Sequence, residues 1–372
     1  MILVLNSGSS SVKYRLVDLH RPGWGPAGLV ERVGEPGGVP DHAAALRRVA
    51  DDLGLDDLPG LRAVGHRVVH GGARFREPAV IDGSVLAAIR DLVPLAPLHN
   101  PANLAGIEVA QALRPDVPHV AVFDTAFHAT LPPPAASYAL DSATAERFGI
   151  RRYGFHGTSH RFVATRTAAL LGRPVAELNT IVLHLGNGAS ATAVCGGRSV
   201  ETSMGLSPLE GLVMGTRSGD LDPAVVSHLH RVGGMSVAEI DDLLWHRSGL
   251  AGLCGDNDMR EVLARQEGGD PAATLAFTVY CHRIRKYVGA YHAVLGRLDA
   301  VAFTAGVGEH AAQVRTASLA GLEAWGIAVD PARNEAGGEG PRVVSPDGAR
   351  VSVCVVPTDE ELAIAEEVDA LL

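Results

Sequence analysis

The chain has 372 residues, of which 47% are hydrophobic and 20% charged, and its formal net charge is −10. This length suggests two domains with an ordinary apolar core, and the negative charge argues against a partner that is a nucleic acid or a membrane surface. The four cysteines lie far apart and form no Cys-x-x-Cys pair. We therefore expect reduced thiols and a cytoplasmic protein, without a disulfide frame or a cysteine zinc site.

Apolar alternation and turn residues predict an opening meander of strands, followed by helices that alternate with single strands. The expected strands are 2–5, 12–18, 28–33, 63–69 and 117–123, and the expected helices are 43–53, 84–92 and 103–113. Three consecutive prolines at 132–134 interrupt this order, because neither a helix nor a central strand continues through them. We place the change of domain just before these prolines.

The second part of the chain repeats the plan. The expected strands are 180–185, 190–195, 198–201, 299–304 and 351–356, and the expected helices are 223–231, 236–247, 271–296 and 311–324. A last helix is expected to begin at Thr358, because residues 358–361 have the spacing of a capping box. The predicted fold class is α/β, with a duplicated plan of meander strands and crossover helices rather than one long Rossmann sheet.

An apolar strand that runs into a tight polar turn occurs twice. The first copy is 1–5 followed by 6–13, and the second is 180–185 followed by 186–192. Backbone N–H groups in such turns hold anions, so two copies facing each other would grip a polyphosphate. Residues 303–310 suggest a third strand that ends in a glycine turn. A lone glycine turn is usually a hairpin element, but the duplication favours a phosphate site.

Two arginines stand among small residues. Arg67 lies at a strand end beside a glycine pair, and Arg217 lies in a loop rich in glycine and serine. Most arginines pair with a nearby carboxylate at the surface. Small neighbours, however, allow close approach by an anion, and the planar guanidinium fork matches phosphate and carboxylate oxygens.

The candidates for chemistry are one histidine, His156, and three acidic residues: Asp124, Glu360 and Asp258. His156 lies four residues before His160, a spacing that fits zinc, but no His-Glu-x-x-His pattern accompanies it and a hydrogen-bonded core histidine is commoner. Asp124 closes a buried strand, where a carboxylate needs a partner or a metal. We assign Glu361 to the capping box, which leaves Glu360 free to face a hard cation such as Mg²⁺.

These motifs resemble those of the acetokinase family. Residues 5–13 look like its first signature and 204–223 like its second, and the segments between them and after them follow in the expected order: 65–72, 97–101, 123–131, 152–160, 184–188, 304–309 and 357–362. The resemblance implies two duplicated ribonuclease-H-like domains of the actin and heat-shock-70 type, with an interdomain active-site cleft. The expected N-terminal domain is 1–126 plus 362–372, with the first phosphate loop. The expected C-terminal domain is 127–361, with the second phosphate loop, the adenosine site and the interface of a homodimer.

The resemblance also implies roles for individual residues. The expected catalytic residues are His156, Arg217, Arg67 and Asp124, and Asn6 and Glu360 are expected at Mg²⁺, with Mn²⁺ as an alternative. Acetate is expected to contact Arg67 and an apolar pocket made of Val69, Leu98, Phe155 and Pro208. ATP or ADP is expected at Lys13, His184, Leu185, Gly186, Asn187, Gly188, Asp258, Met259, Arg260, Gly306, Val307, Gly308, Glu309 and His310.

The implied reaction is a reversible, direct phosphoryl transfer between ATP and acetate, which gives acetyl phosphate and ADP. The acceptor carboxylate is already ionised at pH 7, so no general base is needed. Three alternatives stay open. The first is a kinase of propionate or another short acid, since one methylene changes binding by only about 1–3 kcal/mol. The second is a non-catalytic nucleotide switch, which the set of Arg67, Arg217 and His156 disfavours. The third is a zinc hydrolase that uses His156 and His160.

Overall fold

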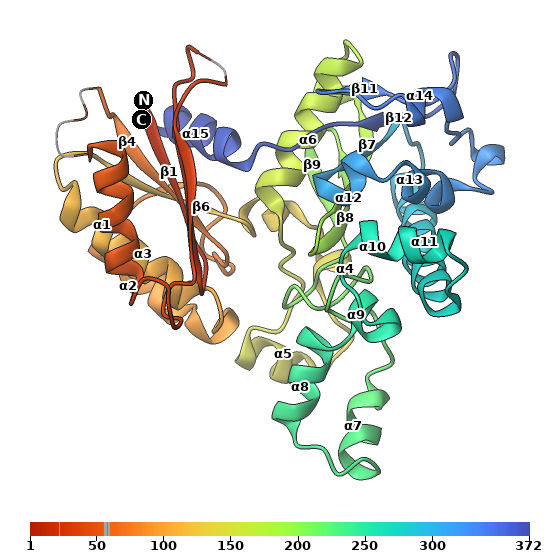
Figure 1. The fold of residues 1–372 in the computed structure, drawn as a ribbon, viewed down its shortest axis with the longest axis horizontal. Helices are drawn as coiled ribbons and strands as arrows, with labels where there is room; N and C mark the ends of the chain where they lie inside the picture. The colour runs from red at the N-terminus through yellow and green to blue at the C-terminus, as the bar shows by residue number, and fades with distance from the viewer. Residues whose placement is uncertain (22, 56–57, 59) are drawn as a thin grey trace. The chain divides into compact units, whose positions relative to one another are not determined.

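The computed structural model describes residues 1–21, 23–55, 58 and 60–372. The chain divides into two compact units (Figure 1). Unit 1 consists of Met1–Ala129, Gly157–Ser159 and Asp359–Leu372, and unit 2 consists of Thr130–His156 and His160–Thr358. Within the described residues each unit is built on one six-stranded sheet. None of the described helices is both long and apolar enough to cross a membrane.

The sheet of unit 1 combines a meander with parallel strands. In spatial order its strands are β3 (Ala27–Glu31), β2 (Ser11–Val17), β1 (Ile2–Ser7), β4 (Ala63–Val68), β6 (His119–Phe123) and β5 (Ala79–Val80). Strands β1, β4 and β6 are parallel, whereas the other pairings are antiparallel. The helices of this unit are α1 (His42–Leu53), α2 (Gly83–Asp91), α3 (Asn100–Leu113) and α15 (Glu360–Leu371).

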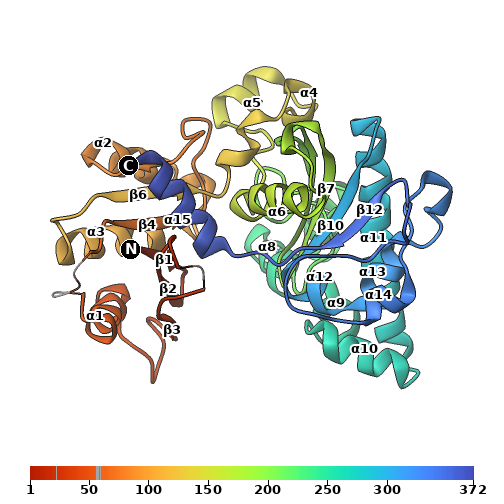
Figure 2. The same ribbon diagram turned by 90° about the horizontal axis from the view of Figure 1, so that it is seen from above.

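Strand β1 shows why both faces of this sheet are covered. Side chains alternate between the two faces of a strand. Leu3 and Leu5 lie in one buried cluster with Leu46 of α1. Val4 lies in another with Ile364 of α15. Figure 2 shows α15 lying along the strands of unit 1. The continuous apolar run of β1 is therefore explained by burial on both sides.

The sheet of unit 2 repeats the same order and directions. Its strands are β9 (Arg198–Thr202), β8 (Ala189–Cys195), β7 (Asn179–Leu185), β10 (Ala300–Thr304), β12 (Ser352–Val355) and β11 (Arg342–Val343). Strands β7, β10 and β12 are parallel, and the other pairings are antiparallel, as in unit 1. The predicted α/β fold class with a duplicated plan is confirmed.

Helices α4 to α14 follow residue 130. They are α4 (Pro133–Ala136), α5 (Ser142–Phe148), α6 (Gly157–Leu170), α7 (Ala224–Arg231), α8 (Val237–His246), α9 (Gly249–Cys254), α10 (Met259–Glu267), α11 (Pro271–Leu295), α12 (Ala305–His310), α13 (Ala312–Leu319) and α14 (Pro331–Glu335). Short 3₁₀ turns lie at Val93–Leu95, Ala126–Thr130, Val175–Glu177 and Glu323–Trp325. Helix α6 begins in unit 1, and its residues from His160 onward belong to unit 2.

Two local expectations were wrong. The segment 303–310 does not end in a glycine turn, because β10 ends at Thr304 and α12 begins at once at Ala305, where φ is 62°. The helix expected over 311–324 ends at Leu319. A short helix also begins within the proline run, at Pro133, because proline is tolerated in a first helical turn.

The expected capping box at 358–361 was wrong as well. The N-cap of α15 is Asp359, whose carboxylate accepts a hydrogen bond of 2.9 Å from the Leu362 N–H. Glu361 instead forms an ion pair of 2.5 Å with Lys13 of β2. The helix is therefore capped one residue later than the predicted Thr358.

Candidate functional site

Arg67 and Asp124 form a buried ion pair in unit 1. Arg67 lies near the end of β4, and Asp124 directly follows β6, the next strand in the sheet. The Arg67 Nε donates to Asp124 Oδ1 at 2.9 Å and its Nη2 to Oδ2 at 2.5 Å. Asp124 is only 2% exposed, so this two-point pairing supplies the partner that a buried carboxylate requires.

Two further predicted residues reach the same guanidinium. Asn6, on β1, accepts a hydrogen bond of 3.3 Å from Arg67 Nη1 through its Oδ1 atom. Glu360, the first residue of α15, places Oε2 at 3.8 Å from Arg67 Nε. Burial alone would lower the pKa of Arg67, but the charges of Asp124 and Glu360 outweigh burial and raise it. We name these four residues the Arg67 cluster.

The oxygen atoms of the Arg67 cluster suit a hard divalent cation. Mg²⁺ prefers oxygen ligands, retains several waters and needs one or two protein carboxylates. Asp124 and Glu360 offer carboxylates and Asn6 offers an amide oxygen, all gathered around one guanidinium. Within the described residues no group of three or more His, Cys, Asp or Glu side chains is placed to hold a metal. Such an ion would therefore depend on these few oxygens and on water.

In unit 2 a group of histidines lies beside the second polar turn. The ring of His156 stacks on His184 with centroids 4.3 Å apart, and its Nδ1 lies 2.9 Å from Ser190 Oγ. His160 Nε2 lies 2.7 Å from the same hydroxyl. The two rings thus share one hydroxyl, which favours the hydrogen-bonded reading over a zinc pair. Ser190 was not predicted, although its place within 186–192 was a usable signal.

Arg217 contacts the same turn. Its Nη1 donates to the Pro208 carbonyl at 2.6 Å, and its guanidinium carbon lies 5.7 Å from the centroid of a Trp245 ring. A Cβ atom at Gly188 would lie 2.7 Å from Arg217 Nη2, so glycine is what permits this approach. In the described part of the chain no carboxylate shifts the pKa of Arg217, and burial lowers it.

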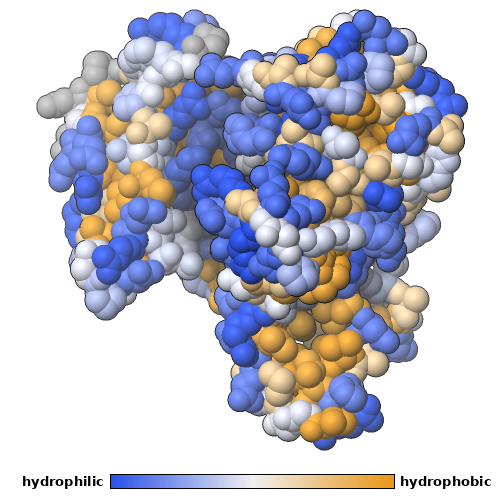
Figure 3. All heavy atoms as spheres, turned by 45° about the vertical axis from the view of Figure 1, so that its right-hand side comes forward, coloured by the Kyte–Doolittle hydropathy of each residue, from blue (hydrophilic) through white to orange (hydrophobic). Residues whose placement is uncertain are grey.

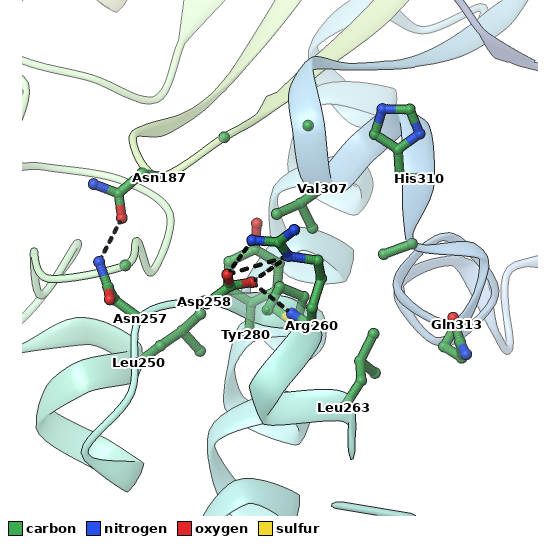
Figure 4. A pocket seen from close by; sticks show the side chains of 15 residues that line it. Asn187, Leu250, Asn257, Asp258, Arg260, Leu263, Tyr280, Val307, His310 and Gln313 are labelled. Carbon is green, nitrogen blue, oxygen red and sulfur yellow. Dashed lines mark hydrogen bonds and ion pairs between the residues drawn. The ribbon is translucent and has the colours of Figure 1, made fainter. Parts of the chain in front are cut away.

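Unit 2 contains a pocket of about 520 Å³ between the second turn, α10 and α12 (Figure 4). Eight of the predicted nucleotide residues line it: Gly186, Asn187, Asp258, Met259, Arg260, Gly306, Val307 and His310. Seven lining residues were not predicted: Gly215, Leu250, Asn257, Leu263, Tyr280, Ala311 and Gln313. Six predicted residues do not line it: Lys13, His184, Leu185, Gly188, Gly308 and Glu309. Asn257 and Tyr280 carry no local motif, so spacing alone did not reveal them.

Side-chain contacts hold the walls of this pocket. Asp258 is the N-cap of α10, and its ion pair with Arg260 of 2.5 Å lowers the pKa of Asp258 to about 2. On the opposite side, Asn257 Nδ2 donates to Asn187 Oδ1 at 3.3 Å and joins the second turn to the segment before α10 (Figure 4).

Gly308 and Glu309 lie in the last turn of α12 and are held by Arg315 of α13. Arg315 is 1% exposed, and its Nη1 donates to the carbonyls of both residues at 2.9 Å. Asn334 accepts from Arg315 Nε at 2.6 Å, and burial lowers the pKa of Arg315 to about 10. The end of α12 is therefore fixed by a buried cation that satisfies its carbonyl groups.

The residues expected around the acetate methyl group are divided between the units. Val69 is 9% and Leu98 is 53% exposed in unit 1. Phe155 is 2% exposed and Pro208 is half-buried in unit 2. A pocket shared by these four side chains stays a prediction.

Comparison with known proteins shows which enzymes this chain is similar to. The chain is 61% identical to the acetate kinase of Streptomyces avermitilis, over 100% of this chain and 97% of that protein. It is 40% identical to the acetate kinase of Porphyromonas gingivalis, whose crystal structure superposes with a TM-score of 0.95 over 100% of this chain and 99% of that one. A propionate kinase structure from Francisella tularensis gives 0.92 at 40% identity, over 98% of each chain.

The proteins that this chain resembles are kinases, and the chain is an enzyme of that class. It belongs to the acetokinase family, whose model matches residues 1–366. The predicted family and the predicted enzyme class are confirmed. The roles of individual residues stay predictions.

Proposed function

We propose that this protein transfers a phosphoryl group reversibly between ATP and acetate, giving acetyl phosphate and ADP. The observation that carries this proposal is the acetokinase match over residues 1–366. We infer that units 1 and 2 are the two expected domains, and that residues of both take part in the reaction.

The nucleotide is assigned to the pocket of unit 2. Leu250, Leu263 and Val307 offer apolar surface for a base, and the Gly186–Asn187 turn offers backbone N–H groups for phosphates. This division of apolar and polar walls supports a nucleoside phosphate over a wholly polar ligand.

The chemical difficulty of the reaction is that two anions must meet in line. At an effective dielectric constant of about 20, two like charges 4 Å apart repel each other by roughly 4 kcal/mol. Arg217 is suited to offset this repulsion, since no described carboxylate neutralises it. His156, fixed by Ser190 and by stacking on His184, is positioned as a second donor to the transferring group.

The Arg67 cluster is assigned to the acceptor and the cation. Arg67 is oriented by Asp124 and would present its guanidinium to the acetate carboxylate. Asn6, Asp124 and Glu360 would hold Mg²⁺ or Mn²⁺. When bound, such an ion neutralises phosphate charge. Because the acceptor is ionised at pH 7, none of these residues is needed as a general base.

A homodimer formed through unit 2, in the cytoplasm, completes the proposal. Exposed apolar side chains occur on and beside α7 and α8, at Val225, Val232 and Val237. Figure 3 shows apolar residues gathered at the lower end of the view, where these helices lie. Light scattering coupled to gel filtration would test the dimer, and a mass of 38.8 kDa, that of a single chain, would contradict it.

The test of the activity is a hydroxamate assay with ATP, Mg²⁺ and acetate, because hydroxylamine traps acyl phosphates. We expect acetyl hydroxamate to form, to disappear when EDTA exceeds the Mg²⁺, and to return when Mg²⁺ is restored. If neither acetate nor propionate gave an acyl phosphate, and acetyl phosphate with ADP gave no ATP, the proposal would be wrong.

Propionate kinase is the second candidate function, favoured by the 40% identity to the Francisella tularensis protein. One methylene in an apolar pocket changes transition-state binding by about 1–3 kcal/mol, which is roughly a 10- to 200-fold preference. A comparison of kcat/KM for the two acids decides between them. The acid with the higher kcat/KM is the preferred substrate.

A further inference from the structure

We propose that the Tyr280 hydroxyl binds the nucleoside part of the nucleotide. The inference deepens the proposed function and rests on the assignment of the unit 2 pocket to a nucleotide. It adds a side chain that neither the duplicated turns nor the acetokinase motifs include.

Tyr280 lies on α11 and lines the pocket together with residues of α10 and α12. It is 2% exposed, and its hydroxyl oxygen has no hydrogen-bond partner among the described residues. Buried polar atoms in folded proteins are nearly always hydrogen-bonded, so one that is left over at a pocket wall points to a ligand.

Two pairs of polar side chains in the wall already bond to each other. Figure 4 shows Asp258 joined to Arg260 and Asn187 joined to Asn257. Tyr280 therefore offers a polar group that the protein itself leaves unused.

The surroundings define which part of a nucleotide this hydroxyl would meet. Leu250, Leu263 and Val307 line the same pocket, and an apolar wall suits a base or sugar better than a charged phosphate. A hydroxyl both donates and accepts, so it can pair with a ring nitrogen, an amino group or a sugar hydroxyl. We therefore expect the contact to strengthen nucleoside binding without selecting between purines.

Tyr291 provides a matched control on the same helix. It lies about three helical turns after Tyr280, is 4% exposed, and also has a hydroxyl without a partner in the described residues. Unlike Tyr280, it does not line the pocket. The two tyrosines thus share burial and an unused hydroxyl, but only Tyr280 lines the pocket.

The experiment measures binding of ADP and of pyrophosphate, each with Mg²⁺, by calorimetry on wild-type protein, Tyr280→Phe and Tyr291→Phe. We expect Tyr280→Phe to weaken ADP binding about 5- to 10-fold and to leave pyrophosphate binding unchanged. Tyr291→Phe should change neither. Wild-type ADP affinity in Tyr280→Phe would overturn the inference, and so would an equal loss for pyrophosphate.

Thermal unfolding separates binding from stability. Removing a hydroxyl that has no partner breaks no hydrogen bond, so both variants should unfold at or above the wild-type temperature without ligand. ADP should then raise the unfolding temperature of Tyr280→Phe less than that of Tyr291→Phe, and equal rises would contradict the inference.

If wild-type protein made acetyl phosphate while Tyr280→Phe bound ADP normally, only the inference would fail. If wild-type protein made no acetyl phosphate, the proposed function would fail, and the ADP binding comparison would still test the inference.

Discussion

Arg67 and Arg217 lie in opposite electrostatic surroundings, although both were predicted for the same reason. Arg67 is enclosed by the carboxylates of Asp124 and Glu360, which raise its pKa. Arg217 is held by the Pro208 carbonyl and a nearby Trp245 ring, and burial lowers its pKa because no described carboxylate compensates for the lost water.

Small residues next to an arginine in the sequence therefore indicate that another group can approach the guanidinium closely. They do not indicate which group that is. In unit 1 the approaching group is the protein's own carboxylate, so Arg67 is fixed before any substrate arrives. In unit 2 a neutral carbonyl holds the guanidinium and leaves its charge uncancelled. Substitutions in the two units and a change of pH test this difference, and the largest expected effect is at Arg67.

Replacing Arg67 with Ala should reduce both stability and activity. It leaves Asp124 buried without a counter-charge, which costs about 3–5 kcal/mol of unfolding free energy, and it should lower kcat by about 100-fold or more. Urea denaturation and the hydroxamate assay measure the two effects. The double variant Arg67→Met with Asp124→Leu should recover much of the stability and none of the activity. An Arg67→Ala protein of wild-type stability would show that the pair is not structurally required.

Replacing Arg217 with Ala should reduce activity while changing stability little, since no ion pair is lost. We expect kcat/KM to fall by about 100- to 1000-fold, because a guanidinium aimed at developing charge is removed. Arg217→Lys should recover part of the loss, since it restores the charge without the fork. The exposed Arg231→Ala serves as the control. Near-normal turnover would remove Arg217 from the site.

Acid should destabilise unit 1 through a buried pair of histidines. His66 and His119 stack with their ring nitrogens 2.9 Å apart, and burial lowers the pKa of both. The unfolded chain takes up protons near pH 6.5, whereas the folded chain resists them. Stability from this pair is therefore present above that pH and is lost as the pH falls below it. Between pH 6.5 and 5.5 we expect a loss of about 1–2 kcal/mol in urea unfolding. The double variant His66→Gln with His119→Gln should show a smaller loss, and an identical loss would rule the pair out.

The smallest expected effect concerns the helix that carries Glu360 to the Arg67 cluster. Asp359→Ala removes the N-cap of α15 and should cost about 1 kcal/mol in unfolding free energy. Asp359→Asn keeps a capping side chain and loses only its ion pair with Arg15, so it should be close to neutral. Equal losses in the two variants would assign the effect to Arg15 instead of the cap.

Sequence patterns predicted the architecture well because they are local. Ten described strands of the two sheets lie in apolar runs that the sequence indicated, whereas the two-residue edge strands β5 and β11 were not predicted. The repeat of strand and turn is by itself enough to indicate duplication. Arg67, Asp124 and Glu360 were each predicted singly, from a glycine pair, a strand end and a helix start, and the role of Asn6 came from the family resemblance. Their convergence follows from strand order, which brings the ends of β1, β4 and β6 to one edge.

What sequence could not predict depends on register or on distant partners. The capping interpretation placed the N-cap at Thr358, one residue before the observed Asp359. Both residue types cap helices, so the pattern alone does not fix the register. The glycines of 303–310 suggested a turn, but they lie in a helix whose end is fixed by Arg315. Tyr280 looks like any core residue of a long helix until α10 and α12 place a pocket beside it.

The last helix of the chain has a consequence for biosynthesis. Ile364 and Val368 of α15 cover one face of a sheet whose first strand contains Val4, so that face stays uncovered until residues 360–371 are translated. While the ribosome makes 130–358, the nascent first unit carries an uncovered apolar surface. A nascent chain arrested before α15 should therefore bind chaperones, and its release should coincide with emergence of that helix.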